Sequence, residues 1–219
     1  MASLSHSIPL TSWRAATTWS FRPVMTGPLI GGLTLFGFGE GLLVCARWGA
    51  TPWTVFAEGV SRHTGLSIGM ATALISAFVL VLWVPLRERP GIGTIANLIV
   101  IAWSLNETVY VVGQHHPLWL RVLLVGGALE AIGLGSALYL TTGLGPGPRD
   151  GMMTSVHRHF GFSVVYVRAG IEGTVLIIGW LLGGGVGIAT ALYAGAIGFA
   201  IGWNLQLVGK IVGREEASS

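Results

Sequence analysis

Beyond residue 26, the chain alternates between long apolar stretches and short connections rich in glycine, proline or charge. Six of the stretches are close to the ~20 residues that an α-helix needs to cross the hydrocarbon core of a bilayer. They are residues 28–46, 66–86, 94–113, 118–142, 163–183 and 187–208. The pattern predicts an all-α integral membrane protein with six transmembrane helices.

The chain also contains an internal repeat. A shift of 96 residues aligns residues 31–106 with 127–202 without a gap, and 21 of those 76 positions are identical. Each copy holds three apolar stretches, and an odd number forces the second copy to insert upside down. We therefore expect a 3+3 inverted repeat with halves at 27–113 and 114–208. A cytoplasmic or interfacial lead-in, 1–26, and a cytoplasmic tail, 209–219, complete the chain.

One short helix is expected in each half, after its first span. Each begins at a proline, which suits the first helical position, and each ends before a glycine, which suits the left-handed position that follows a helix. At about 1.5 Å per residue, neither is long enough to cross a bilayer. These helices are residues 52–64 and 148–160. Two interpretations are open: they lie flat at the membrane surfaces, or they dip into the protein as re-entrant half-helices.

The re-entrant interpretation makes the start of each short helix a candidate binding site. Helix N-termini attract anions, glycines allow close backbone approach, and an arginine can hold a carboxylate or phosphate with two hydrogen bonds. Asp150 has the simpler alternative role of complementing the helix dipole. The candidate substrate-binding residues are Gly145, Gly147, Pro148, Arg149, Asp150, Pro52, Trp53 and Arg168.

Ionisable groups inside apolar spans are costly, which makes them functional candidates. Arg168 and Glu172 are four residues apart on one helix face and are expected to pair. Glu130 and Glu172 are the candidate proton-coupling residues, with a structural ion-pair role as the alternative. Glu40 and Glu107 lie nearer the ends of their spans, and are expected to reach interfacial water or a backbone donor.

Composition narrows the class of protein. The residues are 52% hydrophobic and only 10% charged, and 34 are glycine, which excludes a water-soluble enzyme, a secreted disulfide scaffold and a disordered tail. Basic residues are scattered singly rather than in a stripe, so we expect no nucleic-acid partner. Eight Lys and Arg residues fall on one side of the spans and three on the other, which predicts cytoplasmic N- and C-termini. The eight are Arg14, Arg22, Arg87, Arg89, Arg149, Arg158, Lys210 and Arg214; the three are Arg47, Arg62 and Arg121.

Catalytic motifs are weak. Gly65 to Gly69 matches the G-x-S-x-G pattern of hydrolases, but no strand precedes it and the second copy lacks the last glycine. The histidines lack metal-ligand spacing, and no phosphate-binding loop is present. We expect no enzyme activity, catalytic residue, metal or cofactor. Two stripes of small residues are expected to pack closely against other helices. They are Thr190, Ala194, Gly198 and Gly202, and Gly127, Ala131 and Gly135.

Three segments together resemble the YczE/YitT group of bacterial multi-pass membrane proteins. They are residues 143–151 (GLGPGPRDG), 64–69 (TGLSIG) and 89–94 (RPGIGT). The likeness extends over about residues 27–206. It implies a protein of the bacterial cytoplasmic (inner) membrane, in a group whose activity is largely unassigned, and it transfers no catalytic residue.

The favoured hypothesis from the sequence is a small secondary transporter, or permease-like protein, for a small molecule. Arg149 favours an anion, and the acids in the spans favour proton coupling. The alternative is a non-transporting accessory or assembly protein, or a substrate-binding subunit of a larger membrane complex. The expected partners are the lipid bilayer, an unidentified small-molecule substrate, and a second copy or a membrane partner.

Overall fold

The computed structural model describes residues 8–218, which are all-helical apart from their connections and contain no strand. A short 3₁₀ turn, η1 (Pro23–Met25), and a π-helical turn, η2 (Gly27–Gly31), lead into the first long helix. The helices are α1 (Gly32–Ala46), α2 (Pro52–Thr64), α3 (Ile68–Trp83), α4 (Ile92–Val112), α5 (Leu118–Thr141), α6 (Pro148–Phe160), α7 (Val164–Leu181) and α8 (Ile188–Ser218).

Five helical segments of the described chain are long and apolar enough to cross a membrane. They are Pro23–Ala46, Ile92–Val112, Leu118–Thr141, Val164–Leu181 and Ile188–Val212. The sixth expected span, 66–86, corresponds to α3, which is only 16 residues long and forms a pair with α2 bent by 112°. Five expected spans are therefore confirmed by length and composition, and the sixth depends on counting that bent pair as one.

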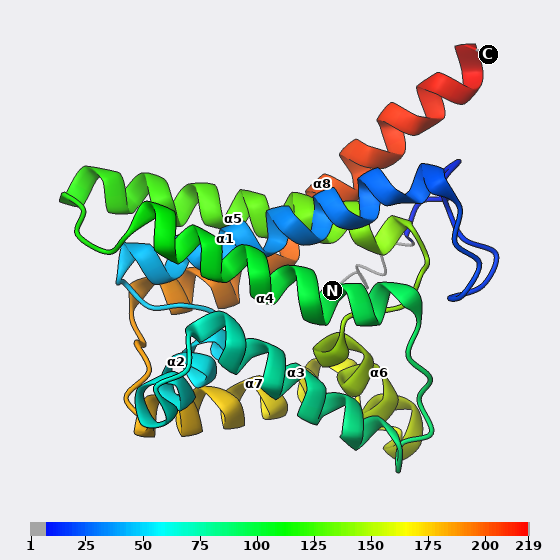
Figure 1. The fold of residues 1–219 in the computed structure, drawn as a ribbon. Coiled ribbons are helices and arrows are strands. Elements are labelled where there is room, and N and C mark those ends of the chain that lie inside the picture. Colours follow the sequence, from blue (N-terminus) through cyan, green and yellow to red (C-terminus); the bar gives the residue numbers. More distant parts are fainter. Residues whose placement is uncertain (1–7, 219) are drawn as a thin grey trace.

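The helices form two layers (Figure 1). One contains α1, α4, α5 and α8, in which α1 packs against α4 and α5, and α5 packs against α8. The other contains α2, α3, α6 and α7, in which α2 packs against α7 and α3 packs against α6. Each short helix therefore packs against a helix from the other half of the sequence, α2 against α7 and α6 against α3.

Glycines allow the central helices α1 and α5 to meet backbone to backbone. A Cβ added at Gly32 would lie 2.8 Å from the Gly135 carbonyl oxygen, and one at Gly135 would lie 2.6 Å from the Gly32 oxygen. The expected close packing at Gly135 is confirmed. The stripe on α8 differs, because Ala194 and Gly198 are exposed and no atom lies within 4 Å of a Cβ added at Gly198.

The described part of the lead-in and the C-terminal part of α8 form the two ends of the described chain. The described part of the lead-in lies across the end of α5, where the Ala15 amide donates to the Thr142 carbonyl and the Thr11 hydroxyl to the Thr141 carbonyl. At the other end, α8 does not stop at residue 208 but continues to Ser218. Residues 1–7 of the lead-in lie outside the described part of the chain.

Candidate functional site: a buried ion pair where the two short helices begin

The two short helices have the expected bounds, and their ends explain why. At the start of α2, the Thr51 side chain accepts the Thr54 amide at 3.2 Å, and Pro52 takes the first helical position. In α6, Pro148 takes the same position, but the preceding residue is Gly147, which has no side chain to cap the helix. Gly65 and Gly161 end the helices in the left-handed conformation, with φ of 72° and 75°.

The first turn of α2 is buried in the protein, whereas the first turn of α6 is buried at Pro148 and Gly151 and exposed at Asp150. Pro52, Trp53, Thr54 and Val55 are all buried, as is Pro148. The last turn of each helix is mostly exposed, and α6 is also exposed at Asp150 and Thr154. The start of α2 is therefore covered by other parts of the protein.

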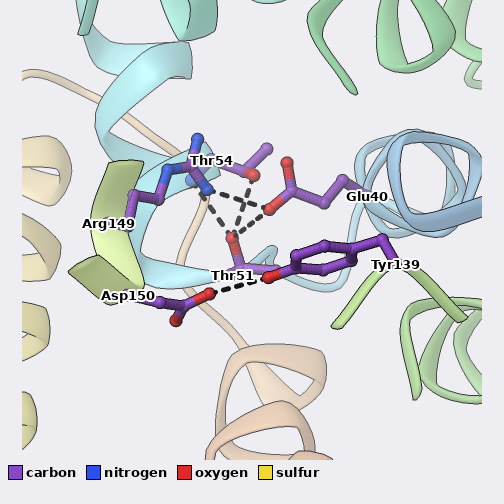
Figure 2. Close-up of polar contacts among 6 residues, drawn as sticks. All are labelled: Glu40, Thr51, Thr54, Tyr139, Arg149 and Asp150. Carbon is purple, nitrogen blue, oxygen red and sulfur yellow. Dashed lines mark hydrogen bonds and ion pairs between the residues drawn. The ribbon is translucent and has the colours of Figure 1, made fainter. Parts of the chain in front are cut away.

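Glu40 of α1 connects the two N-termini. Its carboxylate is only 1% exposed, and its Oε1 accepts hydrogen bonds from Arg149 Nη1 of α6 and from the Thr51 hydroxyl, both at 3.1 Å. The Thr54 hydroxyl lies 2.9 Å from that of Thr51. Figure 2 shows these side chains converging from α1, α2 and α6. Each charge of the pair is tolerated in the protein interior because the opposite charge lies beside it.

The Arg149 guanidinium has a second partner from the opposite half of the chain. Its Cζ lies 5.3 Å from the centre of the Trp53 ring, which suits a cation–π contact. Arg149 and Trp53 occupy equivalent positions in the two sequence copies, 96 residues apart. The cluster therefore joins the two copies through residues in which they differ.

A small polar cavity of about 30 Å³ adjoins the ion pair. Its lining includes Thr72, Asn97, Arg149 and Asp150, and it is large enough for a water molecule or a small ion. Tyr139 also lines it and donates from its hydroxyl to Asp150 Oδ2 at 3.0 Å (Figure 2). Asp150 thus has a specific hydrogen-bond partner in addition to its favourable place at the helix N-terminus.

Three buried polar atoms around this region have no hydrogen-bond partner within the described chain. They are Glu40 Oε2, Trp53 Nε1 and Thr72 Oγ1. Unsatisfied buried groups are uncommon in native proteins because each costs free energy. Their grouping around the ion pair indicates a place where a small polar molecule would gain hydrogen bonds.

Six of the candidate binding residues lie together at this site: Pro52, Trp53, Gly147, Pro148, Arg149 and Asp150. Gly145 has a different role. Its φ of +113° and its close contact with Gly91 dock the loop before α6 on the start of α4. Its close backbone approach is therefore to the protein itself.

The remaining candidates lie elsewhere. Arg168 Nε and Glu172 Oε1 are 2.9 Å apart on α7, so the expected pairing is confirmed. These two residues line a larger cleft between α7 and α8, which also reaches Pro52. Glu130 is exposed on α5 and accepts a hydrogen bond from the Asn204 side chain of α8 at 2.9 Å. It does not take part in the central cluster.

Sequence reasoning missed Glu40. The expectation that its carboxylate reaches interfacial water or a backbone donor is wrong, because the side chain is buried against Arg149 and Thr51. Glu40 and Arg149 are separated by 109 residues. The only signal available was the cost of an ionisable group inside an apolar span, which marks the residue but not its partner.

Within the described residues, no group of three or more His, Cys, Asp or Glu side chains is placed to hold a metal ion. The side chains of the central site form an ion pair and hydrogen bonds with one another.

The apolar helices and the buried charges define an all-helical membrane protein. Residues 26–206 match the model of a family of unknown function (DUF6198), and the chain belongs to this family. An uncharacterized protein of Haemophilus influenzae is 38% identical over 204 residues, covering 93% of this chain and 94% of the relative. The uncharacterized membrane protein YczE of Bacillus subtilis is 29% identical over 194 residues, covering 85% and 90%.

A further relative, the uncharacterized protein YyaS of Bacillus subtilis, is 24% identical over 165 residues, covering 74% of this chain and 82% of the relative. The resemblance to the YczE/YitT group is thus confirmed by YczE itself. No solved structure matches the chain.

Proposed function

We propose that the protein is a small secondary transporter built as a 3+3 inverted repeat, in which α2 and α6 are re-entrant half-helices. One observation carries the proposal: the N-termini of two short helices from opposite halves meet at a buried Glu–Arg pair. Inverted-repeat transporters place substrate and coupling ions where such half-helices begin. The proposed setting is a bacterial inner membrane, with both termini in the cytoplasm.

Hydrogen bonds repeated at the 96-residue interval support the inverted repeat. The Gly93 amide donates to the Leu144 carbonyl at 2.8 Å, and the equivalent Ala189 amide donates to the equivalent Trp48 carbonyl at 2.9 Å. Each bond fixes the loop before a short helix to the start of the last span of the other half. When two copies are related by a two-fold axis, each is expected to make the same contact with the other.

The ion pair suggests how a proton is coupled to substrate. While Glu40 is ionised, it holds Arg149, so the guanidinium is not available to an acidic group on the substrate. Protonation of Glu40 weakens that pair and releases Arg149. Proton binding and substrate binding then favour each other. Glu40 thereby joins Glu130 and Glu172 as a proton-coupling candidate.

Uptake in proteoliposomes tests the proposal. Purified protein under an inward proton gradient is offered a broad panel of labelled metabolites, with proton influx followed by a trapped pH-sensitive dye. We expect proton-dependent uptake of at least one solute, its loss in Arg149→Ala, and unchanged uptake in Arg121→Ala, which alters an arginine at the start of α5. Absence of uptake and proton flux across the whole panel contradicts transport.

One observation favours the alternative of an accessory protein or a subunit of a larger complex. Only 11% of the apolar window of α7 is buried, against 67% for the first span. A helix so little covered by its own chain offers a surface to a second copy or a membrane partner. Purification in mild detergent distinguishes the two functions: a second protein in fixed stoichiometry, together with absent uptake, supports the alternative.

A further inference from the structure

A large cleft lies between α7 and α8. It has a volume of about 1030 Å³, comparable to the upper range of small-molecule sites. Its walls are mostly apolar, with Leu176 on α7 and Phe199 and Trp203 on α8. Within the described lining, the charged residues are Arg168 and Glu172.

The equivalent place in the first half is closed. There α3 and α4 meet at Gly69, where an added Cβ would lie 2.3 Å from the Ala102 oxygen. Val165, which is 72% exposed, takes the position of Gly69 in the second copy. The cleft is therefore a property of the second half and not a consequence of the shared repeat.

The two copies also differ in the residues that face these spaces. Thr72 and Ser76 line the 30 Å³ cavity in the first half, and Arg168 and Glu172 take the equivalent positions in the 1030 Å³ cleft. The two neutral hydroxyls of the small cavity are thus replaced by an ion pair in the large cleft. Since a charge in a span is costly, this replacement indicates a ligand that uses it.

The inner end of the cleft reaches the central site. Pro52, the first residue of α2, belongs to its lining, and the next residue, Trp53, stacks on Arg149. The cleft and the central site are therefore connected through the first residues of α2.

The charges in the cleft restrict what it can bind. Arg168 and Glu172 hold each other at 2.9 Å, yet their side chains remain 39% and 19% exposed. A ligand with a single charge would compete with one member of the pair and leave the other without a partner. A ligand with both charges satisfies both members at once, and an apolar body fits the remaining walls.

We propose that the α7–α8 cleft binds a small zwitterion with an apolar body, such as an apolar amino acid. Arg168 holds its carboxylate and Glu172 its ammonium group. The inference rests on the proposed transport function and names its substrate class. It also replaces the expectation of a simple anion, because the cleft presents a glutamate, Glu172, beside its arginine, Arg168.

Photolabelling with matched probes tests this proposal on the purified full-length protein. Photo-leucine carries both charges and a diazirine in its apolar side chain. 4,4-Azipentanoic acid and the corresponding diazirine alkylamine carry only the anion or only the cation. A phosphatidylethanolamine with a diazirine in its acyl chain reports on zwitterionic lipid. Labelled peptides are located by mass spectrometry.

We expect photo-leucine to label residues 164–176 and 194–206 more strongly than either singly charged probe. Labelling should fall at least about tenfold in Arg168→Gln and in Glu172→Gln, because each loses a charge-assisted hydrogen bond. Lys210→Gln removes a cation from α8 outside the cleft lining and should leave labelling unchanged. The double variant Arg168→Met/Glu172→Leu removes the pair without leaving a lone charge, so it should fold and still lose labelling.

Equal labelling by the three small probes, labelling that survives in the folded double variant, or labelling by the lipid probe alone overturns the proposal. The result is independent of transport: cleft labelling without uptake in proteoliposomes rejects the proposed function and keeps the ligand class. Uptake without zwitterion-specific labelling keeps the proposed function and rejects the ligand class.

Discussion

The helices α2 and α6 are two copies of one short helix that have kept the same shape and acquired different chemistry. Both have 13 residues, start at a proline and end at a left-handed glycine. At the start of α2, Trp53 and Thr54 supply an aromatic face and a hydroxyl, whereas α6 supplies Arg149 and Asp150 there. The shared residues thus determine the backbone, and the differing residues form the site between the two copies.

Among the features that distinguish the two short helices, the ion pair of Arg149 should have the largest effect on stability. Arg149→Met leaves the Glu40 carboxylate buried without a cation, and we expect a loss of about 3–5 kcal/mol in the free energy of unfolding. Glu40→Leu combined with Arg149→Met removes both charges and should cost much less. Denaturant titration in detergent measures both values. If the double variant is as unstable as the single one, unpaired charge is not the cause.

An exchange of large and small residues offers a second test. In the contact of α3 with α6, Trp83 lies against Gly151, where an added Cβ would be 2.1 Å from the indole ring. At the equivalent contact of α7 with α2, the small residue is Gly179 and the larger one is Val55. Gly151→Val alone should cost about 1–3 kcal/mol or more through overpacking.

The double variant Gly151→Val/Trp83→Gly gives the first contact the residues of the second. It should be more stable than the sum of the two single changes predicts, by about 0.5–3 kcal/mol. The same denaturant titration provides the double-mutant cycle. Simple additivity would show that the two contacts are not equivalent.

The ends of the short helices could be predicted from the sequence, but their partners could not. Proline at the first position and glycine after the last are local signals, so the bounds 52–64 and 148–160 are confirmed. The contact of Glu40 with Arg149 depends on how α1 and α6 pack, and no local pattern relates two residues 109 positions apart.

Packing stripes show the same limit. The glycines of α5 and α8 have similar spacing, yet Gly135 meets α1 while the Cβ position of Gly198 faces open space. Small residues allow a second helix to approach closely, but they do not determine whether a second helix packs against them. The difference between the packed α3–α4 contact and the open α7–α8 cleft therefore appeared only in the structure.

The smallest effects should be equal in the two copies. Gly65 and Gly161 both have positive φ and no atom within 4 Å of an added Cβ, so an alanine at either meets backbone strain alone. Gly65→Ala and Gly161→Ala should each cost about 1–2 kcal/mol. Unequal costs in the same titration would indicate that the two helix ends, although alike in shape, contribute differently to the stability of the protein.

The central claim is that the two short helices enter the protein from opposite sides of the membrane. Thr64 and Phe160 are repeat-equivalent, exposed, and the last residues of α2 and α6. Cys45 is buried and is the one cysteine of the chain, so Cys45→Ser gives a suitable background. The most direct measurement is labelling of Thr64→Cys and Phe160→Cys by a membrane-impermeant maleimide in right-side-out and inverted vesicles. We predict that Thr64→Cys reacts from the periplasmic side and Phe160→Cys from the cytoplasmic side; reaction of both from one side would contradict the inverted arrangement.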